Sequence, residues 1–315
     1  MGKEKKSNNL FSVSGDVFLD TAFSLNEIFY PKERNKKYIK NTEIRKIIND
    51  SEVRIICPYT LSSPELRVYL ALMAICCDFN VSYEVESDIK DQHYIKLREH
   101  VYIKGNDNQA TLIGAECYLA DILRIAGLQT GGAQYELLEE ILLRLYMTTI
   151  IIKDKSKTTP MRLLNFDIFD KEKKGKSKIS FILNSRSSDI IFGTDSIGNK
   201  IKRRYISMHD FLKLEESQYF VFVFLSWWVF EGNTQNIYID TLCEKIYSGF
   251  GKLADSTKRS HRSKIANDLA NIDSLDGWNV NLSGKGRNLK ATITREKSSD
   301  RRKRLKLLKV PNNTV

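Results

Sequence analysis

The chain has 315 residues, of which 42% are hydrophobic and 28% charged, and its net charge at pH 7 is +11. This length predicts two domains, and this composition excludes a disordered chain. No apolar run approaches the roughly 20 residues that span a bilayer, and the polar N-terminus lacks the apolar core of a secretory signal.

The five cysteines are scattered, with no C-x-x-C pair among them. This pattern predicts a reducing cytoplasm, with neither disulfides nor a zinc site. The four histidines show neither metal-ligand spacing nor pairing, so we expect no catalytic residues, no metal site and no cofactor. The protein is therefore predicted not to be an enzyme.

The first half of the chain contains the signals of a helix–turn–helix followed by strands. Residues 1–53 are charged and irregular and are interpreted as a partly ordered N-terminal arm. A Ser cap followed by Pro64 and Glu65 predicts a helix over 62–77, and alternation predicts a strand over 81–85. The further elements expected in this half are helices over 117–127 and 133–146 and strands over 149–153, 161–169 and 178–183.

A similar order of elements recurs in the second half. Residues 185–204 are rich in Gly, Ser and Asp and are expected to form a linker. Helix, turn, helix and β-ribbon is the order of a winged helix. The sequence therefore predicts an α+β fold with two tandem winged-helix domains, over 54–184 and 205–297, each with a short β-ribbon wing. The elements expected in the second domain are helices over 218–230, 239–247 and 256–273 and strands over 278–282 and 289–294.

Nearly all of the excess positive charge lies at the C-terminal end. Residues 256–315 hold fifteen Lys or Arg and five Asp or Glu, a net charge of +10 out of +11 for the whole chain. Localised positive charge on a compact element is typical of nucleic-acid binding. Residues 298–315 form a basic tail, which is predicted to add affinity that is independent of DNA sequence.

The helix expected over 256–273 has the composition of a DNA-reading helix. Ile265, Leu269 and Ile272 form its core face, and short polar side chains around one Arg lie opposite. Such side chains reach base edges in the major groove, while flanking cations contact phosphates. Asp255 or Ser256 is expected to cap the helix; a solvated basic face is the alternative interpretation. The DNA contacts predicted in this domain are Ser256, Lys258, Arg259, Ser260, Arg262, Ser263, Lys264, Asn267, Lys285, Arg287 and Lys290.

The second helix of the first domain differs, because its outer face carries Glu136, Glu139 and Glu140. Carboxylates facing a phosphate groove would be repelled. Only the N-terminal end of this helix and the basic hairpin tips are expected to approach DNA, which predicts phosphate contacts or a protein interface. The residues predicted to make such contacts are Thr130, Tyr135, Lys155 and Lys157, with Lys153 and Arg162 as further candidates.

Several short blocks occur in an order and spacing that we associate with one family, and the chain resembles the RepC-type initiators of IncQ-like plasmids, among the iteron-binding plasmid replication initiators. The resemblance covers about residues 61–297. The blocks that carry it are Leu61-Ser62-Ser63-Pro64-Glu65-Leu66-Arg67, Gly131-Gly132, Met161-Arg162-Leu163-Leu164, Tyr205-Ile206-Ser207-Met208, Ile239-Asp240-Thr241-Leu242-Cys243, Thr257-Lys258-Arg259, Gly277-Trp278-Asn279-Val280 and Ile293-Thr294-Arg295.

This resemblance implies a bacterial, cytoplasmic protein that binds direct repeats (iterons) at a plasmid origin as double-stranded DNA. It implies opening of an AT-rich region, where a plasmid or host replicative helicase is loaded, with the C-terminal domain as the main base reader. No membrane partner is implied, and self-association is left open. The alternative is a winged-helix transcriptional regulator or autorepressor without origin-opening activity.

Overall fold

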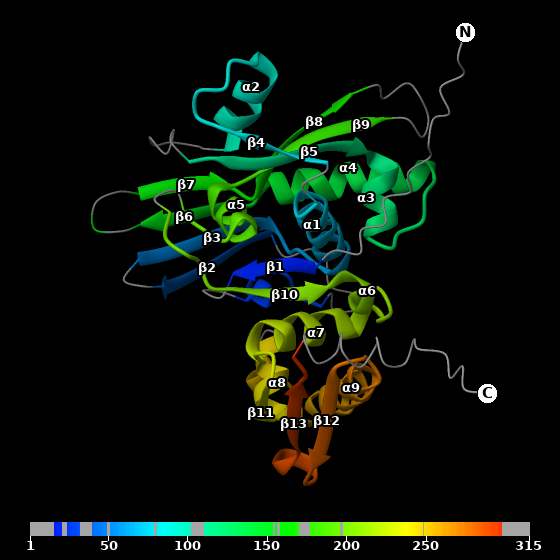
Figure 1. Ribbon diagram of the computed structural model, residues 1–315. Coiled ribbons are helices and arrows are strands. Elements are labelled where there is room, and N and C mark those ends of the chain that lie inside the picture. Colours follow the sequence, from blue (N-terminus) through cyan, green and yellow to red (C-terminus); the bar gives the residue numbers. More distant parts are fainter. Residues whose placement is uncertain are drawn as a thin grey trace, which may run out of the picture.

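The computed structural model describes residues 16–20, 24–31, 40–48, 51–78, 81–101, 110–153, 155, 158–169, 177–195, 198–247 and 249–297. Much of the predicted N-terminal arm, Lys157 and the predicted basic tail lie outside the described residues. The N-terminal sheets and the helices between them form the upper part of Figure 1, and the C-terminal elements form the lower part. None of the described helices is long and apolar enough to cross a membrane.

The upper part contains, within the described residues, two antiparallel four-stranded sheets. The chain passes from one sheet to the other at Leu163, which is buried and whose N–H donates to the carbonyl of Thr148 (3.1 Å). The prediction of one continuous strand over 161–169 is therefore wrong. In sheet order, the strands are β2 (Lys40–Ile48), β3 (Ser51–Tyr59), β6 (Thr149–Lys153) and β7 (Thr158–Arg162) in one sheet, and β4 (Ser82–Val85), β5 (Leu112–Tyr118), β9 (Lys178–Leu183) and β8 (Leu164–Phe169) in the other.

Helix α1 (Ser63–Cys76) lies at the centre of this part and is buried along nearly its whole length. Its start matches the predicted cap: the Glu65 carboxylate accepts hydrogen bonds from the N–H and the hydroxyl of Ser62, each 2.8 Å long. The predicted helices over 117–127 and 133–146 are confirmed, with slightly different ends. The other helices of this part are α2 (Gln92–Val101), α3 (Leu119–Ile125), α4 (Gly132–Met147) and α5 (Ser185–Phe192).

Two segments that were expected to be irregular form regular structure. Strands β2 and β3 begin within the predicted arm, and β1 (Asp16–Asp20) pairs with β10 (Arg203–Ser207). Helix α5 lies within the predicted linker, so that prediction is wrong for its eight residues. Three serines of this segment, Ser185, Ser187 and Ser188, are buried, and the Ser188 hydroxyl donates to the carbonyl of Asn184 (2.9 Å) and accepts from the N–H of Ile113 (3.0 Å).

The lower part is built around α7 (Glu216–Trp228), which confirms the predicted core helix. A three-stranded antiparallel sheet with the order β11-β13-β12 packs beside it. The sequence does not predict β11 (Asn233–Tyr238), because most of its side chains are polar and exposed. The remaining elements are α6 (Met208–Phe211), α8 (Ile239–Ile246), η2 (Phe250–Lys252), α9 (Asp255–Asp273), β12 (Trp278–Ser283), η3 (Gly286–Asn288) and β13 (Lys290–Arg295), and η1 (Leu25–Glu27) precedes them in the chain.

Within the described residues, one topology occurs twice. Unit 1 consists of α1, β5, α3, α4, β8 and β9, and unit 2 of α7, β11, α8, α9, β12 and β13. In each unit the third strand lies between the first and the second, giving β5-β9-β8 and β11-β13-β12. Unit 1 differs by two insertions: β4 and α2 lie between α1 and β5, and the β6–β7 hairpin lies between α4 and β8, with β6 paired to β3.

Candidate nucleic-acid interface

Helix α9 is held on unit 2 by one apolar face. Ile265, Leu269 and Ile272 are fully buried, which confirms the predicted core face. Beside them Asp268 is also buried, and its Oδ1 accepts a hydrogen bond from the hydroxyl of Ser217 on α7 (2.9 Å). Burial raises the pKa of the Asp268 carboxyl above its ordinary value. The opposite face of α9 is therefore the one that is turned to solvent.

That opposite face carries most of the predicted DNA contacts of the helix. Short hydroxyl and amide side chains surround one guanidinium and can donate to or accept from base edges. Lys258 is half-buried, and its Nζ donates to the carbonyl of Gly251 (2.8 Å). The predicted residues of α9 that are exposed are Ser256, Arg259, Ser260, Ser263, Lys264 and Asn267.

Arg262 lies in a different environment from the other cations of α9. Its guanidinium forms a bidentate ion pair with Asp240 of α8, with Nη2 2.8 Å from Oδ2 and Nε bonded to Oδ1. Only 12% of the Arg262 side chain is exposed, and its hydrogen bond lowers the pKa of Asp240. Arg262 therefore joins α8 to α9, which makes it a weaker candidate for a phosphate contact than the exposed cations.

The N-terminus of α9 differs from the predicted cap. The helix begins at Asp255, and its N-cap residue is Ala254, which has no side-chain capping group. Asp255 lies inside the first turn, where a carboxylate interacts favourably with the helix dipole. Its Oδ1 is 3.6 Å from Nη2 of Arg287, and both side chains are exposed, so this ion pair is weak.

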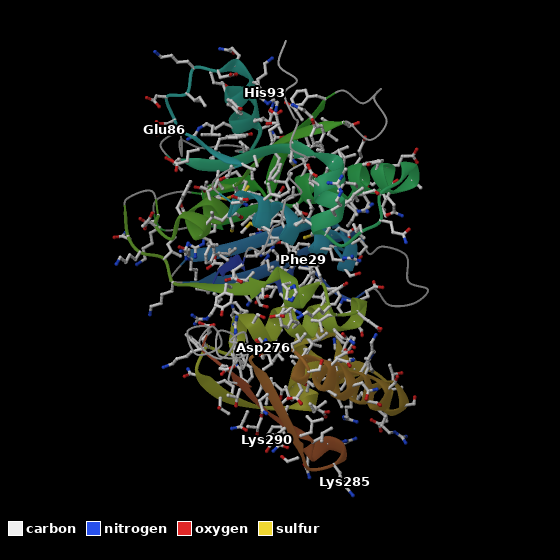
Figure 2. All side chains as sticks on the ribbon, turned by 45° about the vertical axis from the view of Figure 1, so that its right-hand side comes forward. Phe29, Glu86, His93, Asp276, Lys285 and Lys290 are labelled. Carbon is white, nitrogen blue, oxygen red and sulfur yellow. The ribbon has the colours of Figure 1, made fainter. Side chains whose placement is uncertain are left out.

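The β12–β13 hairpin carries the other predicted cations. Lys285 and Arg287 are exposed, and Lys290 is half-buried at the start of β13. Figure 2 shows Lys285 at the tip of this hairpin and Lys290 further along it. Gly284 has a φ of +84°, and a Cβ there would collide with the carbonyl oxygen of Asn288, so the turn requires glycine. We call the exposed residues of α9 together with Lys285, Arg287 and Lys290 the basic face of unit 2.

In unit 1 the corresponding helix presents carboxylates. Glu136 and Glu140 are exposed on α4, while Glu139 is half-buried. At the N-terminal end of α4, Thr130 is exposed and Tyr135 is half-buried against the core. Unit 1 therefore presents negative charge at the position where unit 2 presents its basic face.

The predicted basic hairpin tip of the first domain lies on the inserted hairpin. Lys153 and Lys155 are exposed beside the β6–β7 turn. Arg162 is half-buried, stacks over the ring of Tyr146 (4.1 Å) and donates to its carbonyl (3.2 Å). Because β6 pairs with β3 and β7 pairs with β6, these residues belong to a different sheet from unit 1. The hairpin that is equivalent to β12–β13 is β8–β9.

Two exposed tyrosines were missed by the sequence analysis. Tyr118 ends β5 and is 44% exposed, and Tyr238 ends β11 and is 53% exposed. Each is followed at once by a helix that begins with a buried apolar residue, Leu119 or Ile239. This shared Tyr–apolar step is the sequence signal that could have located the two equivalent positions.

Fold and interface together define a mixed α/β protein with two topologically equivalent units, one of which carries a basic face. The model of the replication protein C (RepC) family matches residues 29–297, and the chain belongs to this family. The resemblance to RepC-type proteins is thereby confirmed, and family membership supports a role as a replication initiator.

Solved structures of RctB share this fold. A crystal structure of RctB domains 2–3 matches with a TM-score of 0.51 and 9% identity, covering 88% of this chain and 97% of that chain. A selenomethionine derivative of the same two domains matches with a TM-score of 0.53 and 10% identity, covering 86% and 96%. No curated protein sequence matches the chain.

Proposed function

We propose that this protein is a plasmid replication initiator that binds direct repeats (iterons) at the origin as double-stranded DNA, mainly through unit 2. The single observation that carries this proposal is the basic face of unit 2. It combines exposed Arg259 and short polar side chains on one helix face with lysine and arginine on an adjoining hairpin. This face therefore has side chains that can read base edges and side chains that can contact phosphates.

We interpret both units as winged helices. Each has three helices and a β-hairpin, with the sheet order first, third, second strand. On this interpretation α9 is the recognition helix that enters the major groove, and the β12–β13 hairpin is the wing that follows the backbone. The basic tail would add affinity that does not depend on sequence, and its effect would fall as the salt concentration rises.

Binding of several repeats is proposed to open an adjacent AT-rich region, where a plasmid or host replicative helicase is loaded. This role requires neither a catalytic residue nor a cofactor, and it would be carried out in the bacterial cytoplasm. Unit 1 would contribute phosphate contacts or a protein interface, because its α4 face is acidic. Self-association stays an open part of the proposal.

The experiment uses a supercoiled plasmid that carries the protein's own origin. Permanganate reactivity of thymines in the AT-rich region measures local opening after the protein is added. At a protein concentration that just saturates the wild type, we expect full reactivity with the wild type and with a Lys96→Ala control, whose substituted side chain is exposed on α2, and reduced reactivity with Arg259→Ala. Specific binding to the repeats without any thymine reactivity would contradict origin opening and favour a transcriptional regulator.

A further inference from the structure

The two exposed tyrosines occupy the same place in the register of the two units. Tyr118, the last residue of β5, lies opposite Lys178, the first residue of β9. Tyr238, the last residue of β11, lies opposite Lys290, the first residue of β13. Each unit therefore has one Tyr–Lys pair at the hairpin end of its sheet.

The backbone around the two pairs is also equivalent. The N–H of Leu119 donates to the carbonyl of Ser177 (3.0 Å), and the N–H of Ile239 donates to the carbonyl of Leu289 (2.9 Å). In both units the acceptor is the residue just before the lysine. The equivalence thus extends from the strand register into the start of the following helix.

Both pairs present polar groups to solvent above a buried layer. The residues that precede the tyrosines, Cys117 and Ile237, are 5% and 7% exposed, whereas the tyrosines are about half exposed. The Nζ of Lys178 lies 5.9 Å from the centroid of the Tyr118 ring. A phenol hydroxyl and an ammonium side by side are donors that bind phosphate oxygens.

We propose that Tyr118 and Lys178 form a phosphate-binding pair for the backbone of double-stranded DNA, equivalent to Tyr238 and Lys290 in unit 2. This inference rests on the proposed function and gives unit 1 a DNA contact that avoids its acidic α4. Lys290 lies in the lower part of the molecule in Figure 2, whereas β5 and α3 lie in the upper part of Figure 1. DNA that contacts both pairs therefore extends along the molecule.

The two pairs differ at the register position two residues before each tyrosine. The Nζ of Lys178 is 3.1 Å from Oε1 of Glu116, and both side chains are nearly half exposed. Glu116 lies opposite Ser180, and the same register position in unit 2 is Asn236, opposite Thr292. Asn236 is uncharged and accepts a hydrogen bond from the Thr292 hydroxyl (2.6 Å). Glu116 therefore competes with phosphate for Lys178, which makes the pair of unit 1 the weaker one.

The test measures the affinity of the full chain for duplexes with origin repeats and with scrambled sequence, over a salt series. Lys178→Gln and Lys290→Gln should each lower the slope of log K against log salt by about one unit, on both duplexes. Between about 50 and 200 mM salt, one unit corresponds to a roughly three- to fourfold smaller loss of affinity. Lys96→Gln, on α2, is the matched control and should keep the wild-type slope.

Two further variants are expected to change the affinity for DNA in opposite directions. Tyr118→Phe removes only the hydroxyl and should weaken binding to both duplexes, whereas Glu116→Gln should tighten it, because the competing carboxylate is gone. Unchanged melting temperatures establish that the variants are folded. A wild-type slope for Lys178→Gln, with no tightening by Glu116→Gln, overturns the pair and indicates a different role, such as a protein interface. The proposed function fails separately, if the wild type does not prefer the repeats.

Discussion

Helices α4 and α9 occupy the same place in the two units but present opposite charges to solvent. The outer face of α4 carries Glu136 and Glu140, and that of α9 carries Arg259 and Lys264 among short polar residues. The topology is shared, so this difference in charge lies in side chains that do not pack in the core. The same architecture can therefore carry a helix face that is able to approach the phosphates of DNA, as in α9, or one that is repelled by them, as in α4.

The buried sides of these helices differ as well. On α4, Nε of Arg144 is 2.8 Å from Oε1 of the fully buried Glu65 on α1. On α9, Oδ1 of Asp268 accepts from the hydroxyl of Ser217 on α7, and its Oδ2 is buried without a hydrogen-bond partner among the described residues. The buried carboxylate between the first and third helices is thus paired with a guanidinium in unit 1, whereas in unit 2 one of its oxygens lacks a hydrogen-bond partner among the described residues.

The largest effect on stability is expected when the ion pair between Glu65 and Arg144 in unit 1 is broken. Glu65→Ala removes the buried partner of Arg144, which retains the exposed Glu140 (3.2 Å), and also removes the acceptor of the Ser62 N–H and hydroxyl; it should lower the free energy of unfolding by about 3 kcal/mol. The equivalent Gln218 in unit 2 is neutral and accepts from the N–H of Glu215 (2.9 Å), so Gln218→Ala should cost about 1 kcal/mol. Urea unfolding followed by circular dichroism measures both, and equal losses would contradict the comparison.

The exposed faces are compared by substitution of one residue in each helix. Arg259→Ala should weaken binding to the origin repeats by about 1–3 kcal/mol and relax sequence preference, because it removes the guanidinium at the centre of the polar strip. Glu136→Gln on α4 is the counterpart and should not weaken binding. Fluorescence anisotropy with labelled duplexes measures both. Equal loss on repeats and scrambled DNA would mean that Arg259 contacts only phosphates.

At Asp268, unlike at Glu65, substitution is expected to raise the stability of the folded protein. Burial raises its pKa in the folded state, so the folded protein retains a proton that the unfolded chain releases near the ordinary value of 3.8. Stability therefore falls as pH rises through this window, and the full penalty is present at pH 7. Asp268→Asn should raise the melting temperature at pH 7 and lose this advantage below pH 3.8. Glu244→Gln, at an exposed position, is the control. If Asp268→Asn raised the melting temperature equally at all pH values, burial of the Asp268 charge would not be the cause.

The smallest effects are expected at the β12–β13 turn. Lys285→Ala and Arg287→Ala should each lower the salt slope of DNA binding by about one unit and weaken all sequences alike, because these side chains contact only phosphates in the proposed complex. A titration over a salt series measures the slope. A loss confined to the repeats would instead assign base contacts to the hairpin.

Local signals explain which elements the sequence predicts correctly. The cap at Ser62 and the apolar face of Ile265, Leu269 and Ile272 each lie within one helix, so α1 and α9 are predicted from neighbouring residues alone. The polar strand β11 and the serine-rich helix α5 are missed, because their stability comes from partners that are distant in the chain. Strand β6 is predicted with its exact bounds, 149–153, but its pairing with β3 is missed, because no local pattern specifies it.

The residues of the candidate site are also predicted only as far as local sequence patterns specify them. A helical wheel places the exposed residues of α9 correctly, because exposure follows from the position of the core face. It does not reveal that Arg262 binds Asp240, which lies 22 residues earlier on another helix. The pairing of Tyr118 with Lys178 likewise requires the strand register, which only the folded structure provides.

The most direct test of the central claim is the affinity of the protein for its own origin repeats and for scrambled duplex, at about 50 and 200 mM salt. If the basic face of unit 2 reads base edges, the repeats should be preferred by about 10³-fold or more at the higher salt. Equal affinity for both duplexes, with a steep fall between the two salt concentrations, would mean that this face binds DNA by charge alone and would contradict the account.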